Sequence, residues 1–379
     1  MISDNKKKFV KFVFLTVNTY DKCRMQISNL HIDTDSNRDL NDREQAILRT
    51  IINLYILNAS PIGSRNLSKY LEKEIKLSPA TIRNIMADLE QMDYISHPHT
   101  SAGRVPTDKG YRFFVDSLLP TEIANINDLE KLNFELDQSK GVSVLKDAGK
   151  LLGTISHYLA VVRIPHLQDL IVHRIELIQI TTNRLLIVVA MDSDIVRTLT
   201  LEIPFEIHQR DLLAVTAFIN DRVSGRSLSY IRQHFQYIAQ EYSDASMPLV
   251  GLFVNSLDKL FHIESNSDKL HLAGTQNLLT LPEFEDVTRV RSVLELIENE
   301  EILVSVLDSS GVYDNAVKVM IGSEMNQESM EDYSFVMSSY KFGSAMGSIG
   351  LIGPRRMNYS KVISLVRAMS DLISQKSNL

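Results

Sequence analysis

The sequence predicts an α+β fold that is divided into several domains, and three observations lead to this prediction. Helical periodicity dominates the first 120 residues, and strand-like runs bounded by turn residues begin near residue 159. A helical block then separates those runs from further strand-like runs beyond residue 300. A sheet that stops and later resumes indicates that one domain is inserted into another. At 379 residues, the chain is long enough for two or three domains.

The stretch Ser78–Tyr111 is the most informative part of the chain and predicts a capped amphipathic helix followed by a hairpin. Ser78 is a suitable N-cap, and Pro79 stands at the first helical position, where its missing N–H costs nothing. One side of the helix is an apolar stripe of Ile82, Ile85, Met86 and Leu89. The opposite side is polar and carries Thr81, Arg83, Asn84 and Asp88. Arginine and asparagine read bases in the major groove, although any surface helix also shows a polar face.

The flanking segments favour DNA binding. Residues 41–58 predict a helix that starts with a capping box formed by Asn41 and Glu44, and Ser64 opens a second, short helix. Together with the helix after Ser78 they predict a helix-turn-helix. Tyr94–Ser96 predicts a strand, His97–Pro106 a hairpin, and Asp108–Leu119 a last helix. A winged helix is the simplest fold that uses all these pieces.

Nine residues of this region are candidate DNA contacts. Ser64, Arg65 and Ser78 would position the domain by contacting phosphate. Thr81, Arg83 and Asn84, on the helix face, would read or flank bases. His99, Ser101 and Arg104 would reach phosphates or the minor groove from the hairpin. His97 and His99 could instead suggest a metal site, but no cysteine or carboxylate stands near them at ligand spacing, so we expect no metal.

The rest of the chain is predicted to alternate between helical segments and groups of strands. Residues 121–140 predict a linker, and Val144–Tyr158 predicts a helix. Strands are predicted at Leu159–Ile164, Ile171–Ile180, Leu185–Ala190 and Ile195–Ile203, with hairpin breaks at Thr182-Asn183 and Asp192–Asp194. Residues 207–265 predict helices. Further strands are predicted at Ile302–Leu307, Val317–Ile321, Ser334–Tyr340 and Ser348–Ile352, before a terminal helix at Ser360–Ser374.

At several of these segments the chain resembles the HrcA family of heat-inducible transcription repressors. The runs SPATIRNIMADLEQMDYI and HPHTSAGRVPTDKGYRFFVD carry the resemblance in the first domain. Further along, Gly274–Asn277 with Pro282–Phe284 resembles a G-x-x-N…PEF segment, Ile321–Glu324 an IGxE segment, and Gly347–Tyr359 a GxIGxIGPxRMxY segment. The resemblance extends from about Leu40 to near the C-terminus.

The resemblance implies a domain organisation and a function. It implies a winged-helix DNA-binding domain over 38–120, a GAF-like mixed α/β domain in two parts, 121–206 and 286–379, and an inserted helical dimerisation domain over 207–285. It further implies a homodimer that binds an inverted-repeat operator, the CIRCE element, upstream of chaperonin and Hsp70-type chaperone operons. Heat would release the repressor as it loses its active fold and the chaperonin that maintains it is occupied by other clients. Two alternatives stay open: a small-ligand-responsive winged-helix regulator and a protein-interaction module that does not bind DNA.

Composition agrees with a cytoplasmic regulator. The single cysteine excludes a disulfide framework, and no apolar run is long enough to predict a membrane span. The net charge is −7, yet basic residues outnumber acidic ones over the first 120 residues, so the acidic excess lies in the rest of the chain. Acidic residues and histidines are scattered without catalytic or ligand spacing, so we expect neither an enzyme nor a cofactor. The segment GSAMGSIGLIGP lacks the Lys-Ser/Thr of a phosphate loop, and its glycines suggest a hairpin.

Residues 1–37 fit the family pattern poorly. Lys6–Lys8 followed by Phe9–Val17 superficially resembles a signal peptide, but Lys11 interrupts the apolar run and no small-residue cleavage site follows. We expect a disordered basic arm, or an upstream start codon with Met25 as the true start.

Overall fold

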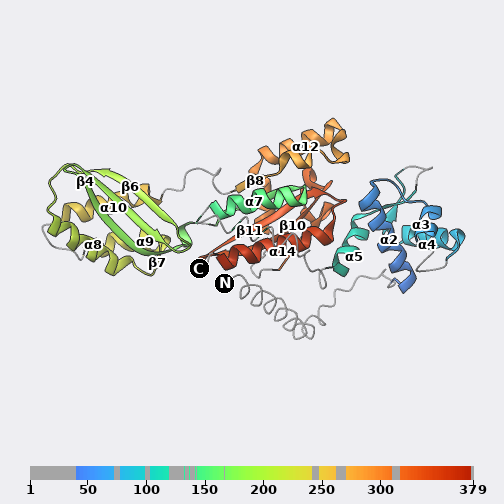
Figure 1. Ribbon diagram of the computed structural model, residues 1–379, viewed down its shortest axis with the longest axis horizontal. Helices are drawn as coiled ribbons and strands as arrows, with labels where there is room; N and C mark the ends of the chain where they lie inside the picture. Colours follow the sequence, from blue (N-terminus) through green and yellow to red (C-terminus); the bar gives the residue numbers. More distant parts are fainter. Residues whose placement is uncertain are drawn as a thin grey trace, which may run out of the picture. The chain divides into compact units, whose positions relative to one another are not determined.

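The computed structural model describes residues 40–71, 77–98, 103–118, 132, 136, 141, 143–165, 167–240, 247–261, 270–309 and 316–376. The predicted arm over residues 1–37 and most of the predicted linker over residues 121–140 lie outside this set. An N-terminal winged-helix domain is followed by mixed helix and sheet (Figure 1).

The winged helix is confirmed element by element. Its helices are α2 (Asp42–Asn58), α3 (Ser64–Leu71), α4 (Pro79–Gln91) and α5 (Asp108–Leu118), and strands β1 (Ile95–Ser96) and β2 (Val105–Pro106) pair antiparallel. The predicted capping box forms at the start of α2, where the Asn41 amide donates to a Glu44 carboxylate oxygen at 2.8 Å and the Glu44 amide donates to Asn41 Oδ1 at 3.0 Å. The apolar stripe of α4 is turned inward, with Ile82, Met86 and Leu89 buried.

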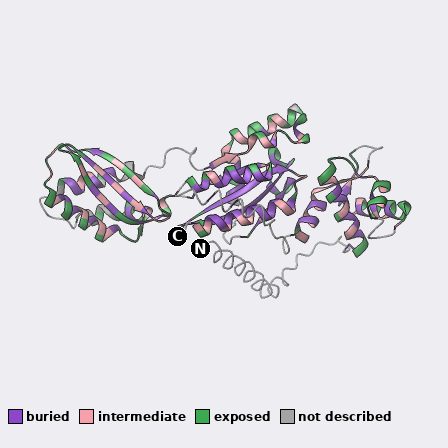
Figure 2. Cartoon of the chain, viewed as in Figure 1, coloured by how far each residue is buried: buried purple, intermediate pink, exposed green. Residues whose placement is uncertain are grey.

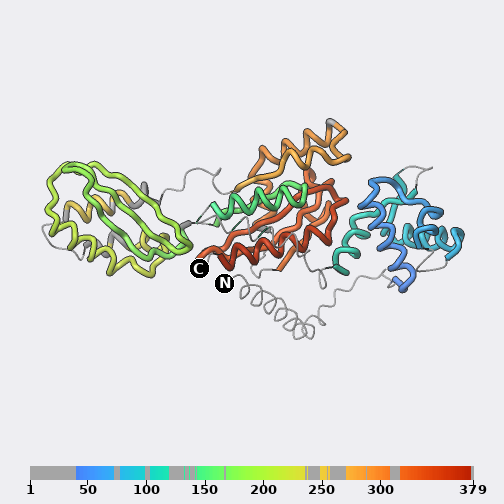
Figure 3. Tube along the Cα trace, viewed as in Figure 1, coloured from blue at the N-terminus to red at the C-terminus, as the bar shows by residue number. Residues whose placement is uncertain are grey.

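A five-stranded antiparallel sheet of order β8-β3-β11-β10-β9 forms the centre of the following domain. Its strands are β3 (Leu159–Arg163), β8 (Leu270–Ala273), β9 (Lys318–Ile321), β10 (Tyr333–Phe342) and β11 (Ala345–Pro354). Helices α7 (Ser143–Ser156) and α14 (Tyr359–Lys376) lie against each other and against the sheet (Figure 3).

The opposite face of this sheet is covered by shorter helices. These are α11 (Thr275–Leu278), η3 (Pro282–Glu285), α12 (Val287–Glu298) and α13 (Glu300–Ser309). Their apolar side chains, among them Phe284, Leu296 and Leu303, share one cluster with Phe335 and Met337 of β10. Because both faces are covered, β10 is buried along almost its whole length.

A second sheet of order β6-β5-β4-β7 is separate from the first. Its strands are β4 (Ile171–Thr181), β5 (Arg184–Met191), β6 (Val196–Glu202) and β7 (Arg226–Ser227), and its helices are α8 (Gln209–Val223), α9 (Leu228–Gln240) and α10 (Met247–Phe261). Both predicted hairpins form, β4 with β5 and β5 with β6. Figure 2 shows buried and exposed residues alternating along these strands, unlike the buried strands of the first sheet.

This topology corrects the prediction that the strands between residues 171 and 203 belong to the interrupted sheet. The chain leaves the five-stranded sheet after β3 and returns to it at β8, so the segment between them contains strands as well as helices. The insertion therefore begins near β4 and not at residue 207. Strand patterns alone do not reveal which strands pair, because β3 and β4 follow each other in sequence yet join different sheets.

Two further segments show what decides between helix and strand. The strand predicted at Ile302–Leu307 is wrong, because these residues lie in helix α13. Glu300 and Glu301 in its first turn suit a helix N-terminus, and a short apolar run cannot be assigned by periodicity alone. The glycine-rich segment before Pro354 is the inner strand β11, where a Cβ on Gly347 or Gly350 would collide with the rings of Tyr340 or Phe335.

Candidate nucleic-acid interface

Helix α4 begins with the cap that the sequence predicts. Ser78 has an extended backbone, and its Oγ accepts a hydrogen bond from the Thr81 amide at 3.1 Å. The hydroxyls of Ser78 and Thr81 are also hydrogen-bonded to each other at 2.9 Å. Both side chains are exposed but already engaged in the cap. The first turn of α4 is therefore fixed by its cap, since the amides of both Thr81 and Ile82 donate to Ser78.

The outward side of α4 presents Arg83 and Asn84. Both are exposed, because Ile82 and Met86 on the opposite side are buried. Among the described residues, no carboxylate forms an ion pair with Arg83. A guanidinium and an amide next to each other on an exposed helix face can donate to base edges without first breaking an internal contact.

Helix α3 carries Ser64 and Arg65, which the sequence predicts as phosphate contacts. Leu67 and Leu71 bury its inner side, and α3 packs against α4. Ser64, at the start of α3, is half-buried, whereas Arg65 is exposed. An exposed arginine at the N-terminus of the helix that precedes a recognition helix is placed to contact phosphate.

The wing is tied by its backbone to the turn between α2 and α3. Arg104 and Ile62 form an antiparallel backbone bridge, with N···O distances of 2.9 Å in both directions. A Cβ on Gly103 would lie 2.5 Å from the Ile62 carbonyl carbon, so this close approach requires glycine. The predicted wing residues His99 and Ser101 lie outside the described residues.

Glu90 of α4 organises the base of the wing, a role that the sequence did not reveal. Its carboxylate forms an ion pair with the Arg104 guanidinium at 2.8 Å and contacts Nδ1 of His97. The Arg104 side chain is only 20% exposed, so its guanidinium faces Glu90 in this structure. To reach a phosphate, Arg104 must exchange this carboxylate for the DNA.

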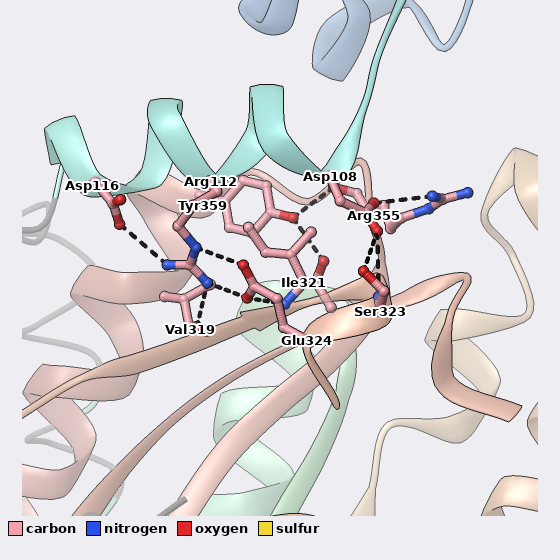
Figure 4. A network of polar contacts seen from close by, with 10 residues as sticks. Asp108, Arg112, Asp116, Val319, Ile321, Ser323, Glu324, Arg355 and Tyr359 are labelled. Carbon is pink, nitrogen blue, oxygen red and sulfur yellow. Dashed lines mark hydrogen bonds and ion pairs between the residues drawn. The ribbon is translucent and has the colours of Figure 1, made fainter. Parts of the chain in front are cut away.

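A polar network joins α5 of the winged helix to the five-stranded sheet domain (Figure 4). Arg112 forms a bidentate ion pair with Glu324, donates to the Val319 carbonyl at 2.7 Å, and contacts Asp116 at 3.2 Å. The pKa of Arg112 is raised because the hydrogen bonds and charge of Glu324 outweigh the effect of burial. This guanidinium therefore bridges the helix and the edge strand β9.

Asp108, at the start of α5, makes the second part of the network. It accepts from Arg355 at 3.0 Å and from the amide and hydroxyl of Ser323 at 3.3 and 3.2 Å. Arg355 also reaches Asp332 at 3.3 Å. Gly322 has a φ of +51°, and a Cβ there would lie 2.4 Å from Asp108 Oδ2, so only glycine lets the carboxylate approach.

The third contact involves α2. Arg356 donates to both carboxylate oxygens of Glu283, at 2.5 and 3.1 Å, and to the Ile56 carbonyl at 2.5 Å. Both side chains of this ion pair are about 15% exposed or less. Sequence reasoning noticed these residues only as members of distant motifs, since no local pattern shows that residues 300 positions apart meet.

In the described part of the chain, no group of three or more His, Cys, Asp or Glu side chains is arranged to hold a metal ion. None of the described helices is both long and apolar enough to cross a bilayer.

A capped helix with an exposed arginine and asparagine, preceded by a helix-turn and followed by a wing, defines a DNA-binding protein of the winged-helix class. Two family models match the chain: "Winged helix-turn-helix transcription repressor, HrcA DNA-binding" over residues 39–117 and "HrcA protein C terminal domain" over residues 142–363. The chain belongs to the HrcA family of heat-inducible transcription repressors, which are not enzymes.

Similar proteins extend over most of the chain. The heat-inducible transcription repressor HrcA of Chlorobium phaeobacteroides strain BS1 is 35% identical over 347 residues, which is 89% of this chain and 98% of that protein. The HrcA repressor of Pelotomaculum thermopropionicum is 35% identical over 346 residues, 89% of this chain and 96% of that protein. A crystal structure of a hypothetical protein shares the fold, with a TM-score of 0.60, 24% identity, and coverage of 89% of this chain and 100% of that one.

Proposed function

We propose that this chain is a homodimeric repressor that binds an inverted-repeat operator, the CIRCE element, of chaperonin and Hsp70-type chaperone operons. Heat stress releases it from DNA, and the chaperonin restores its active fold in the cytoplasm. The five-stranded sheet domain is the GAF-like unit of this proposal, and the four-stranded sheet with α8–α10 is the dimerisation unit.

The exposed pair Arg83 and Asn84 on the capped helix α4 is the observation that carries the DNA-binding part. These side chains are fixed on a rigid scaffold and are not engaged by described carboxylates, as direct readout of bases requires. Arg65 on α3 and Arg104 at the wing flank them and would contact the backbone. Ser64 and Ser78 would add hydrogen bonds to phosphate, and Thr81 would flank the bases beside Arg83 and Asn84. His99 and Ser101 would act from the wing.

The four-stranded sheet supports the homodimer. Residues such as Ile175, Ile187 and Val189 are buried on the side of the helices. The other face is mixed: Ile178, Ile180 and Val196 are 47, 53 and 58% exposed, beside polar residues such as Glu176 and Thr198. Such a face marks an interaction surface. The occupant that we propose is a second copy of the chain, because a two-fold dimer matches the two half-sites of an inverted repeat.

A charge placed at the centre of this face tests the dimer. Val188 lies between Glu176 and Thr198 in the sheet register, so Val188→Arg should convert the dimer to a monomer in sedimentation equilibrium. Leu213→Arg is the matched control, because Leu213 is 65% exposed on helix α8. If both variants remain dimeric, the second copy binds elsewhere.

The DNA part of the proposal is tested by footprinting on genomic fragments at a permissive and a heat-shock temperature, with and without chaperonin. We expect protection of an inverted repeat upstream of chaperone operons at the lower temperature only. Added chaperonin should restore protection after a heat pulse. Protection that is unaffected by temperature would refute heat release, and the absence of any protected inverted repeat would refute the operator.

A further inference from the structure

The inserted unit, which consists of β4–β7 and α8–α10, is linked to the five-stranded sheet domain by two chain connections. One leads from the end of β3 at Arg163 to the short helix η1 (Leu167–Asp169), and the other leads from α10 to β8. Domains that are linked only by chain segments move relative to each other unless a further interface holds them. A noncovalent contact next to the first connection provides such an interface.

The contact starts at the turn between β5 and β6, where the sequence predicted a hairpin. Ser193 and Asp194 both have a φ of +56°, as the two central residues of a type I′ turn do. The Met191 amide donates to the Ile195 carbonyl at 2.8 Å and closes the turn. The backbone that carries Asp192 is therefore fixed by the hairpin.

The Asp192 carboxylate binds backbone groups of both domains. Oδ1 accepts from the Ile171 amide, at the start of β4, at 3.2 Å. Oδ2 accepts at 2.7 Å from the amide of Ser344, which lies in the turn between β10 and β11. The Ser344 hydroxyl in turn donates to the Asp169 carbonyl of η1 at 2.8 Å. One carboxylate thus receives a charge-assisted hydrogen bond from each domain, and we call this meeting of the two turns the hairpin contact.

The hairpin contact requires glycine at position 343. Gly343 has a φ of +60°, and a Cβ there would lie 2.6 Å from both Cγ and Oδ2 of Asp192. The β5–β6 turn also lies beside the segment before α7, since a Cβ on Gly141 would be 3.5 Å from the Asp194 carbonyl oxygen. The turn of the inserted unit therefore meets the sheet domain at two segments that are about 200 residues apart in sequence.

We propose that Asp192 is a positioning residue that holds the inserted unit in one orientation relative to the sheet domain, and thereby sets the half-site spacing that the dimer accepts. The inference rests on the proposed function, because the hairpin contact affects spacing only if the inserted units join the two chains. One added base pair turns the second half-site by about 35° around the duplex. A dimer whose domains cannot rotate should reject that change, and a dimer with loose domains should tolerate it.

The orientation is measured on the full-length protein without DNA. Spin labels are attached at Leu213→Cys on α8 and Arg291→Cys on α12, because the two side chains are 65 and 82% exposed. The single native cysteine is removed by Cys23→Ser. Labelled chains are diluted with unlabelled chains, so double electron–electron resonance records only the distance between the inserted unit and the sheet domain of one chain.

Two variants open the hairpin contact from opposite sides. Asp192→Ala removes both acceptor oxygens, and Gly343→Ala places a methyl group against the carboxylate. Each should widen the distance distribution. Asp221→Ala is the control for the charge, because Asp221 is 73% exposed on α8. Gly225→Ala is the control for backbone strain, because Gly225 has a φ of +78° and a Cβ there would meet nothing within 4 Å.

Both controls should keep the natural distribution. The proposal is overturned if neither Asp192→Ala nor Gly343→Ala widens the distribution. It is also overturned if Gly225→Ala widens it as much as Gly343→Ala does, because strain alone would then explain the effect.

The spacing is measured by gel shift with inverted-repeat duplexes that have the natural half-site spacing or one base pair more or fewer. The natural protein should prefer the natural spacing, and both variants of the hairpin contact should lose about tenfold or more of that preference. An unchanged preference despite a widened distribution would overturn the role in spacing. If the natural protein binds no inverted repeat, the proposed function fails, whereas the distances measured without DNA still decide whether Asp192 holds the two domains together.

Discussion

Arg83 is exposed because the apolar residues on the opposite side of α4 are buried in the core. Ile82 and Met86 anchor α4 in the core of the winged helix, and Ser78 fixes the first turn, so the backbone position of Arg83 is set before DNA arrives. Preorganisation of this kind lowers the entropic cost of binding.

Arg83→Ala should weaken operator binding by about 1–3 kcal/mol if the guanidinium reads a base. A gel-shift titration at fixed salt measures the loss, with Arg291→Ala as control, because Arg291 is 82% exposed and lies on α12, outside the winged helix. Unchanged affinity in Arg83→Ala would remove Arg83 from the readout.

For single residues, the sequence predicts which side chains are exposed better than it predicts which side chains they contact. Helical spacing correctly separates Arg83 and Asn84 from the buried stripe. It does not show that Arg104 faces Glu90, because a side-chain partner 14 residues away depends on how the wing folds back. Local patterns carry backbone propensity and burial, whereas ion pairs depend on the tertiary fold.

The wing is an element in which one carboxylate holds the basic side chains in place. Glu90 attracts Arg104 and contacts His97, so it competes with any phosphate for the Arg104 guanidinium.

Arg104→Ala should weaken binding to specific and nonspecific DNA alike and reduce the slope of affinity against salt by about one. Glu90→Gln distinguishes the two roles of Arg104. If Arg104 binds phosphate, loss of the competing carboxylate strengthens nonspecific binding. If Arg104 only anchors the wing, Glu90→Gln weakens binding as Arg104→Ala does. Fluorescence anisotropy across a salt series measures both variants.

Strand β8 carries a histidine whose protonation opposes folding. Burial lowers the pKa of His271, and the charges of Lys146 and Lys150 on α7 lower it further, whereas Asp147 and a backbone hydrogen bond at Lys146 act in the opposite direction. Nε2 of His271 has no hydrogen-bond partner among the described residues. The neutral ring is therefore the form that the folded protein favours.

The sign of the pH effect follows from this lowered pKa. Above the unfolded-state pKa both states are neutral and His271 has no effect, but as pH falls the unfolded chain takes up the proton first, so stability decreases. The unfolding midpoint should drop between about pH 7.5 and about pH 5.5, and it should drop less in His271→Gln. His173→Gln, which removes an exposed histidine on β4, is the control. An equal drop in all three proteins would contradict the assignment.

At the element level, most predicted helices and strands exist, but their grouping into sheets was not predictable. Strand β3 is a continuous apolar run and β4 alternates, but neither pattern names a partner, and only the long-range pairing of β3 with β8 and β11 assigns the two strands to different sheets. Segment 302–307 became a helix because α13 can bury Leu303 and Val306 against the sheet from a helical face. Tertiary packing decides such ambiguous apolar runs.

For the whole molecule, the motifs beyond residue 280 contact the winged helix. Arg356, which is paired with Glu283, reaches α2, Ser323 and Glu324 reach α5, and Arg355 reaches Asp108. None of these residues belongs to a predicted DNA contact, yet they fix the domain that carries those contacts. Sequence similarity indicated that the motifs matter, but their shared role became visible only when the fold brought them together.

Of these contacts, the Arg112–Glu324 pair gives the most direct test of how the winged helix is held. Its side chains are 29 and 33% exposed, so solvent screens it only partly. In a double-mutant cycle with Arg112→Gln and Glu324→Gln, the two changes should be coupled by about 1 kcal/mol in urea unfolding. The exposed Arg291–Glu295 pair, at 4.0 Å on α12, should give less than about 0.5 kcal/mol.

The same variants test whether the contact between α5 and the sheet domain controls heat release. If operator release begins when α5 leaves the sheet domain, Arg112→Gln and Glu324→Gln should lower the release temperature in a gel-shift series. The double variant should then release at nearly the same temperature as either single one, because the pair acts as a unit. A release temperature that stays at the natural value, despite measurable coupling in urea, would mean that heat acts on another element and that this contact serves stability alone.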